Sequence, residues 1–305
     1  MNKPKIIMFV GLPASGKSTY AKKYTTIHTN TIWLSSDNIR KELYGDEKIQ
    51  DNPDKVFSLM RIRTKEALMQ GVDVVWDSTN ISYKRRMAFL NELKNIPCEK
   101  ICVLMATPYE ECLKRNAERE RKVPEYVIKN MYFSFNIPCW YEGWDDIRIE
   151  YADGAKGSYG SIVDWVESVN DYDQHNSHHT LTLGQHCTKT FMHVYGTLNR
   201  FWEITSAALI HDCGKPKTAT FTDSKGMSTN KCHYYHHQYT GAYDSLFFSD
   251  IGRPLYVAAL IMWHMQPYFW ERDNNEKLHA KYRNLWGELL YEDIMKIHEA
   301  DKAAH

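Results

Sequence analysis

The sequence predicts two domains of different class, an α/β domain built on a parallel sheet with flanking helices and then an all-α domain. Three observations support this prediction. A glycine-rich phosphate-binding pattern follows an apolar run near the amino terminus, at residues 11–18. Strand-like and helix-like segments then alternate up to residue 151, which is typical of a parallel sheet covered by helices. Beyond about residue 175 the apolar residues recur at helical spacing, and all but one of the histidines lie there.

The glycine-rich segment matches the P-loop pattern, which is a glycine, any four residues and then Gly-Lys-Ser or Gly-Lys-Thr. Glycines let backbone N–H groups approach phosphate oxygens, the lysine adds charge at the β- and γ-phosphates, and the serine hydroxyl suits Mg²⁺. The alternative, a plain turn between a strand and a helix, is disfavoured by the apolar run before the loop and the helical run after it. We therefore expect ATP or another nucleoside triphosphate, with Mg²⁺ on Ser18. The expected nucleotide-binding residues are Gly11, Ser15, Gly16, Lys17, Ser18 and Thr19.

Five strands and the helices between them are expected in the first domain. The expected strands cover residues 6–10, 31–35, 72–76, 100–105 and 147–151, each of them rich in apolar or β-branched residues. The expected helices begin near residues 18, 38, 54, 82, 108 and 123. Because parallel strands end at the same edge of a sheet, the side chains at their carboxyl ends are expected to converge on the phosphate site.

A change of composition separates the two predicted domains. Residues 152–161 are rich in glycine and serine, which is typical of a linker. We place the boundary at residue 160, so that the domains are residues 1–160 and 161–305, and residues 162–169 are expected to form a connecting helix. The remainder is expected to be helical, with one short strand considered at residues 218–222.

The overall composition fits a protein with two real cores. Hydrophobic residues make up 43% of the 305 residues, and no apolar run approaches the length of a transmembrane helix, so we expect no membrane partner. The seven cysteines form no CxxC pair, which fits a reducing, cytoplasmic setting. The formal net charge is zero, with 38 basic and 38 acidic residues, so a nucleic acid is expected to be bound locally rather than along an extended basic surface.

Polar side chains at two expected strand ends are candidates for the chemistry at the phosphate site. Asp37 and Asp77 occupy these positions. Asp37 could instead cap the helix expected at residue 38, and Asp77 could cap a helix or bind Mg²⁺ through water. Arg40 lies one helical turn after Asp37, so both can face one cleft. The arginine-rich run at residues 115–122 is either a solvated helix face or a lid over a transferring phosphoryl group.

Taken together, these segments resemble the kinase domain of the phage-type polynucleotide 5′-hydroxyl kinases. The resemblance covers residues 5–140 and rests on GLPASGKST, SSDNIR, WDSTN with two arginines following, and KRNAERERKVP. It implies that Asp37 is the general base for the attacking 5′-hydroxyl and that Arg40 and Asp77 hold the acceptor strand.

The same resemblance implies that Arg119 is the lid arginine on the donor phosphates, on which the P-loop pattern already places Lys17. The lid reads Arg119-Glu120-Arg121 here, with a glutamate where the family has a glycine. This difference leaves the choice between Arg119 and Arg121 open.

In the second half, polar ligand types continue apolar helical stripes. His211, His264 and Asp301 each do so, and His186 continues a weaker stripe. A single histidine on such a face is usually a core residue with its own hydrogen bonds, which is the alternative for each of them. An unpaired buried Asp301 beside the adjacent His211-Asp212 would carry a large free-energy cost. A divalent metal removes that cost, so we expect a metal site here.

This series resembles the HD superfamily of metal-dependent phosphohydrolases over residues 175–305. HDCGKPKT and HQYTGA are similar to the version found in the tail of CCA-adding tRNA nucleotidyltransferases. The resemblance implies a first metal held by His186, His211, Asp212 and Asp301. It implies that His237 and His264 hold a second metal or the substrate phosphate, that Lys215 contacts this phosphate, and that His236 is the alternative to His237. One or two divalent transition metals, Mn, Ni, Co, Fe or Zn, suit this donor set.

The two resemblances together imply RNA end healing. The first domain would phosphorylate a 5′-hydroxyl polynucleotide end, with RNA as the expected partner, and the second would remove a 2′,3′-cyclic or 2′-phosphate. One alternative is a nucleoside or sugar kinase fused to a nucleotide phosphohydrolase. The other is a regulatory protein that binds nucleotide and metal without turnover. The choice between RNA and DNA, the metal and a homo-oligomeric state are left open.

Overall fold

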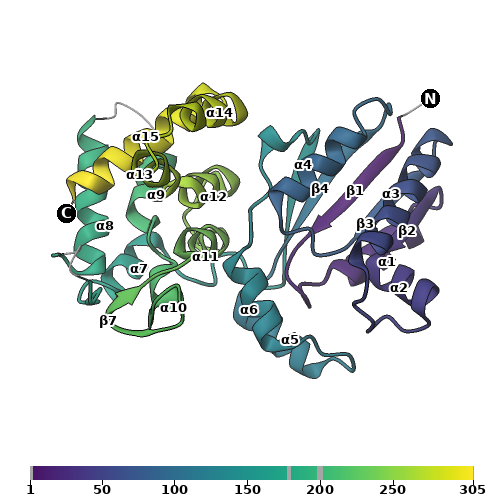
Figure 1. Ribbon diagram of the computed structural model, residues 1–305, viewed down its shortest axis with the longest axis horizontal. Helices are drawn as coiled ribbons and strands as arrows, with labels where there is room; N and C mark the ends of the chain where they lie inside the picture. Colours follow the sequence, from purple (N-terminus) through teal and green to yellow (C-terminus); the bar gives the residue numbers. More distant parts are fainter. Residues whose placement is uncertain (1–2, 177–179, 198–201, 305) are drawn as a thin grey trace. The chain divides into compact units, whose positions relative to one another are not determined.

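The computed structural model describes residues 3–176, 180–197 and 202–304 (Figure 1). Internal contacts divide the chain into two units. The first comprises Met1–Ile128 and Pro138–Asp153, and the second comprises Lys129–Ile137 and Gly154–His305. The change of unit at residues 153–154 lies at the start of the segment whose composition predicts a linker. Nothing in the sequence indicated that residues 129–137 would join the second unit.

The first unit is built on a five-stranded sheet with the strand order β2-β3-β1-β4-β5, and all four pairings are parallel. This confirms the predicted parallel sheet. The strands are β1 (Lys5–Val10), β2 (Thr31–Ser35), β3 (Asp73–Asp77), β4 (Glu99–Ala106) and β5 (Asp146–Tyr151). The strand β1 is central and buried, so the P-loop after it starts from the middle of the sheet.

Helices cover both faces of this sheet, because alternate residues of the inner strands are apolar on both sides. Ile7 and Phe9 of β1 pack with Ala21 of the first helix in one cluster. On the neighbouring strand, the Trp76 ring lies 4.4 Å from the ring of Phe89. The helices are α1 (Lys17–Ile27), α2 (Ser36–Tyr44), α3 (Pro53–Met69), α4 (Tyr83–Glu92) and α5 (Tyr109–Glu118), with the 3₁₀ turn η1 (Trp140–Glu142). Helix α6 (Glu125–Phe133) begins in the first unit and ends in the second.

The second unit is mainly helical. Its helices are α7 (Ile162–Ser168), α8 (Leu183–Thr197), α9 (Trp202–Ile210), α10 (Lys215–Thr218), α11 (His237–Asp244), α12 (Pro254–Trp263), α13 (Gln266–Arg272), α14 (Glu276–Trp286) and α15 (Glu288–Ala303), with the 3₁₀ turn η2 (Ser245–Phe247). The core contains α8, α9, α11, α12 and α15, whose apolar faces pack on one another. Among the described residues, no helix has both the length and the apolar character needed to cross a membrane.

The expectation of an all-helical second half is wrong at one place. Strand β6 (Thr220–Thr222) pairs antiparallel with β7 (Ser228–His233). The short strand considered at residues 218–222 is therefore present, but its partner was missed. The sequence of β7 is STNKCH, in which only Cys232 is buried. Its polar residues do not alternate with apolar ones, so it lacks the period of two that predicts a strand.

Candidate active sites

The P-loop joins β1 to α1 and turns tightly enough to need glycine at two positions. A Cβ on Gly11 would lie 2.6 Å from Oγ of Ser15 and 3.1 Å from Cβ of Met105. Gly16 caps α1 with φ of 97°, in the left-handed region that favours glycine. The loop is also tied to the loop after β3, because the N–H of Gly11 donates to the carbonyl of Thr79 over 3.0 Å.

Lys17 lies buried inside this loop. Its Nζ donates hydrogen bonds to the carbonyls of Gly11, at 3.0 Å, and Leu12, at 2.6 Å. Burial lowers the pKa of Lys17 to about 8, although the nearby carboxylates of Asp77 and Asp37 oppose this shift. The ammonium is thus held by neutral carbonyls, in a position where an anionic ligand would stabilise its charge.

Asp37 lies in the first turn of α2, directly after β2. The alternative that Asp37 caps this helix is wrong, because the helix begins at Ser36 and Ser35 is the cap, its hydroxyl accepting from the N–H of Asp37 over 3.3 Å. The Asp37 carboxylate instead pairs with two arginines. Nη1 of Arg40 lies 3.2 Å from Oδ1 of Asp37, and Nη1 of Arg121 lies 2.9 Å from Oδ2 of Asp37.

Asp77 is the last residue of β3, and the sheet register places it beside Ser35 at the end of β2. Its side chain is buried and accepts a hydrogen bond from the indole N–H of Trp33 over 3.2 Å. Burial raises the pKa of Asp77, while interactions with Ser18 and Lys17 act in the opposite direction. The ends of β2 and β3 therefore bring carboxylates to the edge of the sheet that carries the P-loop, as the parallel topology requires.

The two arginines considered for the lid, Arg119 and Arg121, differ in their surroundings. Arg119 comes directly after α5 and is exposed, and its charge acts on Lys17 by lowering the pKa of that lysine. Arg121 is bound more tightly, because its Nη1 contacts both Asp37 and, at 3.3 Å, Oε1 of Glu47.

A buried ion pair that sequence reasoning missed holds the loop after β3. The guanidinium of Arg86 donates to both carboxylate oxygens of Glu142, at 2.7 and 2.6 Å, and to the carbonyl of Asn80 at 2.8 Å. The Asn80 side chain in turn donates to the carbonyl of Phe9 over 2.7 Å. Arg86 therefore links η1 to the end of β1 and to the segment after Asp77. The two partners are 56 residues apart, so no local pattern could reveal the pair.

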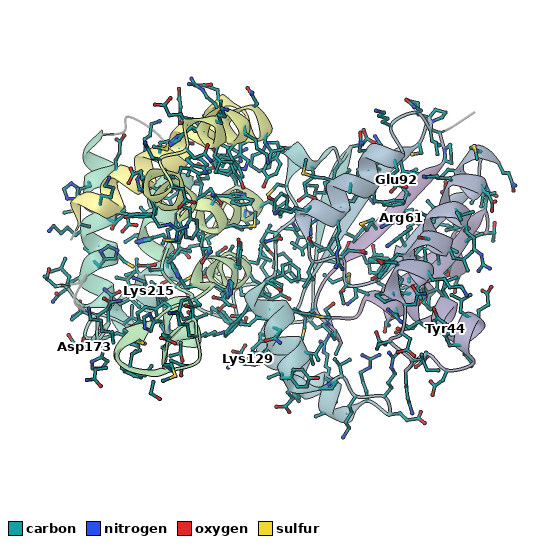
Figure 2. All side chains as sticks on the ribbon, viewed as in Figure 1. Tyr44, Arg61, Glu92, Lys129, Asp173 and Lys215 are labelled. Atoms are coloured by element: carbon teal, nitrogen blue, oxygen red, sulfur yellow. The ribbon has the colours of Figure 1, made fainter. Side chains whose placement is uncertain are left out.

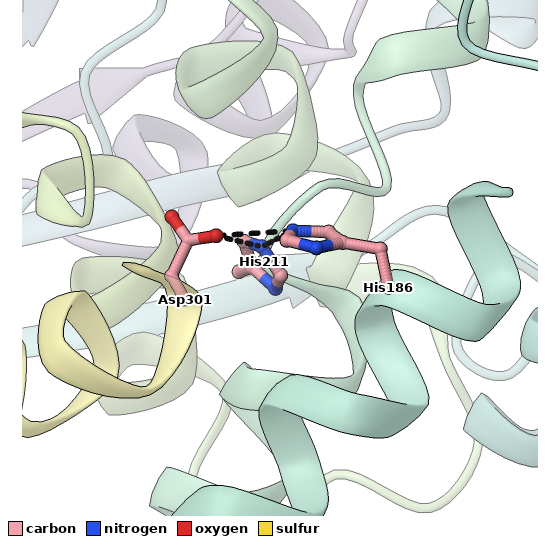
Figure 3. A group of neighbouring side chains, drawn as sticks. All are labelled: His186, His211 and Asp301. Carbon is pink, nitrogen blue, oxygen red and sulfur yellow. Dashed lines mark hydrogen bonds and ion pairs between the residues drawn. The ribbon is translucent and has the colours of Figure 1, made fainter. Parts of the chain in front are cut away.

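In the second unit, six side chains that can each bind metal through nitrogen or oxygen gather in one buried cluster, and they come from five places in the chain. They form two groups, each with its donor atoms within 4.8 Å of one another. The first group is His186, His211 and Asp301, and the second is Asp212, His237 and His264. Figure 3 shows the first group, in which His186 projects from α8 and Asp301 from α15.

Asp301 and Asp212 face the imidazoles at contact distance. Oδ1 of Asp301 lies 3.0 Å from Nε2 of His186 and 3.6 Å from Nε2 of His211. Asp212, a member of the second group, also contacts the first. Its Oδ2 is 3.3 Å from Nε2 of His211, and its Oδ1 is 3.2 Å from Nε2 of His237. A carboxylate in this position can serve two ions or one ion and a substrate.

Backbone carbonyls orient three of the four imidazoles. Nδ1 of His211 lies 2.8 Å from the carbonyl oxygen of Ala208. Nδ1 of His237 lies 2.7 Å from the carbonyl oxygen of Tyr234. Nδ1 of His264 lies 2.7 Å from the carbonyl oxygen of Ile261. Each ring therefore turns Nε2 toward the cluster while Nδ1–H donates to the chain, which is the arrangement that metal-binding histidines use. Because nitrogen and carboxylate donors converge and the rings are oriented, the residues fit a divalent transition metal.

The protonation of the cluster follows from its burial and charges. Burial opposes ionisation of Asp212, but the charges of Lys215 and His211 hold the pKa of Asp212 well below its usual range. Burial lowers the pKa of His264 to about 3, with the charges of His211 and His237 acting in the same direction. His264 is therefore neutral at ordinary pH, as a ligand must be. Burial opposes the charge of His211, but the carboxylates of Asp212 and Asp301 hold its pKa well above the usual range. A metal ion would therefore have to displace a proton from His211.

Lys215, labelled in Figure 2, is the first residue of α10, and its side chain reaches the cluster. Its Nζ lies 2.6 Å from Oδ2 of Asp212 and donates to Oε1 of the buried Gln174 over 2.7 Å. The glycine before it allows this approach, since a Cβ on Gly214 would overlap the carbonyl of His237. Gly214 thus lets α10 and α11 meet closely enough for both to reach the cluster.

His236 is placed differently from His237. His237 begins α11 and is buried in the cluster, whereas His236 is the exposed residue before it, with φ of 68°. Two supporting residues escaped sequence reasoning, Gln174 on Lys215 and Tyr268, whose hydroxyl donates to Oδ2 of Asp301 over 3.0 Å. Both lie in segments without a motif, so only the folded chain reveals them.

Comparison with known proteins bears on the first half. Residues 6–138 match the AAA_33 family, described as an AAA domain. A curated relative is the L-seryl-tRNA(Sec) kinase of Methanococcus maripaludis, 32% identical over 178 residues, which is 54% of this chain and 66% of the relative. Protein kti12 of Schizosaccharomyces pombe is 24% identical over 155 residues, covering 46% of this chain and 54% of that protein. The chain thus spans between about half and two thirds of these relatives.

Two solved structures are also similar in part. One is the Pnkp1/Rnl/Hen1 RNA repair complex, with 20% identity, a TM-score of 0.38 and 44% of each chain covered. The other is a putative kinase from Chloroflexus aurantiacus, with 16% identity and a TM-score of 0.43, covering 55% of this chain and 96% of that one. The family match and the curated relatives support a P-loop domain of the kinase type in the first half of the chain.

Proposed function

We propose that this protein heals RNA ends by two separate reactions, phosphorylation of a 5′-hydroxyl and removal of a phosphate from a 3′ end. The observation that carries the proposal is that one chain holds two clusters of polar side chains suited to phosphate chemistry. One is the P-loop with Asp37 and Arg40 beside it, and the other is the buried histidine and aspartate cluster with Lys215. Their products, a 5′-phosphate and a free 3′ end, are the two ends that a ligation needs.

In the kinase reaction, Asp37 takes the proton from the 5′-hydroxyl as its oxygen attacks the γ-phosphorus, and the bond to the leaving ADP breaks. Lys17 and Arg119 stabilise charge on the transferring group. Arg40 holds a phosphate of the acceptor strand through its planar guanidinium. Asp37 must give up its contact with Arg40 or Arg121, at least in part, to face the hydroxyl, and acceptor phosphate is the natural competitor for these arginines.

In the second reaction, a water adds to phosphorus and one P–O bond of the 2′,3′-cyclic phosphate breaks, after which a second water releases inorganic phosphate. Divalent ions bound at the cluster would supply Lewis acidity for this hydrolysis. His186, His211, Asp212 and Asp301 would hold the first ion, and His237 and His264 would hold a second ion or the phosphate itself. Lys215 stabilises charge on the phosphate oxygens, and Gln174 keeps its ammonium in place.

A second candidate for the kinase acceptor comes from the sequence comparison. The relative at 32% identity is an L-seryl-tRNA(Sec) kinase, so a hydroxyl carried by a charged tRNA is an acceptor of the same chemical kind. A nucleoside or a sugar is the smaller alternative. The RNA 5′-hydroxyl, the seryl hydroxyl on tRNA and the hydroxyl of a nucleoside or sugar are all primary hydroxyls. The three acceptors differ in whether a polynucleotide strand with its phosphates lies beside the hydroxyl.

A competition among acceptors separates these possibilities. We expect transfer from ATP to a 5′-hydroxyl oligoribonucleotide in preference to seryl-tRNA, nucleosides and sugars. Arg40→Ala should raise the KM for the oligonucleotide at least tenfold with little change in the KM for ATP, because one charged contact to the strand is lost. Exposed Lys41 is the matched control, since Lys41→Ala removes a neighbouring charge outside the pair with Asp37. Equal KM values for Arg40→Ala and wild type would remove Arg40 from the acceptor site, and preference for seryl-tRNA would support the second candidate.

A further inference from the structure

A pocket next to α10 and the β6–β7 hairpin has no role in the reactions described so far. Its volume is about 570 Å³, which lies in the range of small-molecule sites. Its walls come from residues 129, 133, 217–220, 222–224, 235 and 236, all of them in the second unit. The volume is sufficient for one nucleoside with room for water.

The walls of this pocket combine positive charge with aromatic rings. Lys129 and Lys217 line it, and Nζ of Lys129 lies 5.3 Å from the centre of the Phe133 ring (Figure 2 labels Lys129). Tyr235 is 39% exposed, and its ring stacks on that of His233 at 5.3 Å with an interplanar angle of 6°. Lysines beside aromatic faces are the combination that binds single-stranded nucleic acid, because the charge holds the backbone and the ring stacks on the base.

The pocket's one lining carboxylate does not cancel this character. Oδ1 of Asp223 accepts hydrogen bonds from the N–H groups of Lys225, at 2.9 Å, and Met227, at 2.8 Å, so it is used by the hairpin turn. Lys217 is partly neutralised, since Nζ lies 3.1 Å from Oδ2 of Asp244. The exposed Lys129 therefore contributes the more available charge.

Two stretches of chain contribute residues both to this pocket and to the histidine and aspartate cluster. His236 lines the pocket, and the next residue, His237, belongs to the cluster. Helix α10 also reaches both places within one turn. Its first residue, Lys215, contacts Asp212, and Thr218 forms part of the pocket wall. One helical turn rises about 5 Å, which is similar to the span from the base of a nucleotide to its phosphate.

The geometry points to this pocket as the site that holds the 3′-terminal nucleoside of the RNA whose phosphate is removed at the cluster. The inference rests on the proposed phosphohydrolase function. The base stacks on Tyr235 or Phe133, Lys129 faces the next phosphate of the strand, and the terminal phosphate reaches Lys215 and the cluster. The pocket thereby sets a preference for nucleotide ends over simple phosphate esters.

The test is a cycle that removes the base from the substrate and the ring from the protein. The substrates are uridine 2′,3′-cyclic phosphate and methyl ribofuranoside 2′,3′-cyclic phosphate, which has no base. In the metal-loaded wild type, removal of the base should raise KM about tenfold, which is typical of one stacking contact. Tyr235→Ala should raise the KM for the uridine substrate by a similar factor, leave the base-free substrate unchanged, and leave kcat nearly constant.

If the base stacks on Phe133 rather than on Tyr235, Phe133→Ala should change the two KM values in the way described for Tyr235→Ala. Phe221→Ala is the matched control. Phe221 is an exposed aromatic residue of the β6–β7 hairpin, and it does not line the pocket. The inference is overturned if both pocket variants leave the KM for the uridine substrate at the wild-type value. It is overturned equally if they raise KM for both substrates by the same factor.

A cross-linking experiment keeps the pocket testable if the wild type hydrolyses neither substrate, which would count against the proposed function. The probe is a 5′-phosphorylated oligoribonucleotide with a 3′-terminal 4-thiouridine. Cross-links in residues 129–133 or 217–236 that Tyr235→Ala weakens and Phe221→Ala preserves would support the pocket. Cross-links confined to other peptides would overturn it.

Discussion

Nη1 of Arg121 lies 2.9 Å from Oδ2 of Asp37, which joins the arginine-rich segment after α5 to the first turn of α2. Asp37 is at the same time 3.2 Å from Arg40. The carboxylate proposed as the base is therefore paired with two cations, and the residue proposed to bind the acceptor strand is one of them. A phosphate that draws away Arg40 would leave the carboxylate freer to accept a proton.

Replacement of Asp37 tests this role directly. Asp37→Ala should lower phosphoryl transfer at least 100-fold and leave the dissociation constant for ATP within about twofold, because the base is lost and the P-loop is kept. Asp46→Ala is a control, since Asp46 is an acidic residue of the loop after α2. Transfer within a few-fold of wild type in Asp37→Ala would show that another group is the base.

The buried pair of Arg86 and Glu142 should be a major source of stability for the first unit. Arg86→Ala leaves the Glu142 carboxylate without its partner in the interior, and such a loss typically costs about 3–5 kcal/mol. Arg85→Ala should cost less than about 0.5 kcal/mol, because the adjacent Arg85 is exposed. Chemical denaturation of the two variants provides the comparison, and similar unfolding free energies would mean that the pair contributes little.

Lys17 predicts a specific dependence of stability on pH in the absence of nucleotide. Burial lowers its pKa from 10.5 to about 8, so between these values the unfolded chain binds more protons than the folded one. The free energy of unfolding should therefore rise with pH across this window, by at most about 3 kcal/mol from this group. The free energy of unfolding of wild type should therefore rise relative to that of Lys17→Met between pH 7 and pH 10, as measured by denaturation at the two pH values. An equal difference between the two proteins at both pH values would contradict the lowered pKa.

Metal removal should separate the two activities. Stripping the protein with a chelator and then adding Mg²⁺ should abolish release of phosphate from 2′,3′-cyclic ends and preserve the kinase. The melting temperature should fall as well, because a ligand that binds only the folded state stabilises it. Asp212→Ala should lose bound transition metal by elemental analysis, since Asp212 faces both groups of the cluster. Undiminished hydrolysis after stripping would return the histidines to the role of core residues.

Much of the architecture could be predicted because short local patterns specify it. Four of the five parallel strands contain a short apolar run, β5 alternates apolar and charged residues, and the P-loop pattern identifies the loop and the helix after β1. Strand β7 was missed because its polar sequence lacks alternation, and Ser35 rather than Asp37 caps α2 because the helix begins two residues before the expected position.

The candidate sites divide in the same way. Spacing alone placed His211, His264 and Asp301 on apolar helical faces, but their convergence depends on contacts between helices far apart in sequence. The roles of Arg121 beside Asp37 and of Gln174 beside Lys215 depend on contacts of this long-range kind. A periodic pattern shows which way a side chain faces on its own helix, and only the packed chain shows what it meets.

The most direct test of two independent healing reactions uses one oligoribonucleotide with a 5′-hydroxyl and a 2′,3′-cyclic phosphate. Wild type with ATP, Mg²⁺ and Mn²⁺ should convert both ends, as read by mass spectrometry of the product. Asp37→Ala should convert the 3′ end alone, and Asp212→Ala the 5′ end alone. An unmodified 3′ end in the wild type, or loss of both conversions in either variant with its fold intact, would contradict the account.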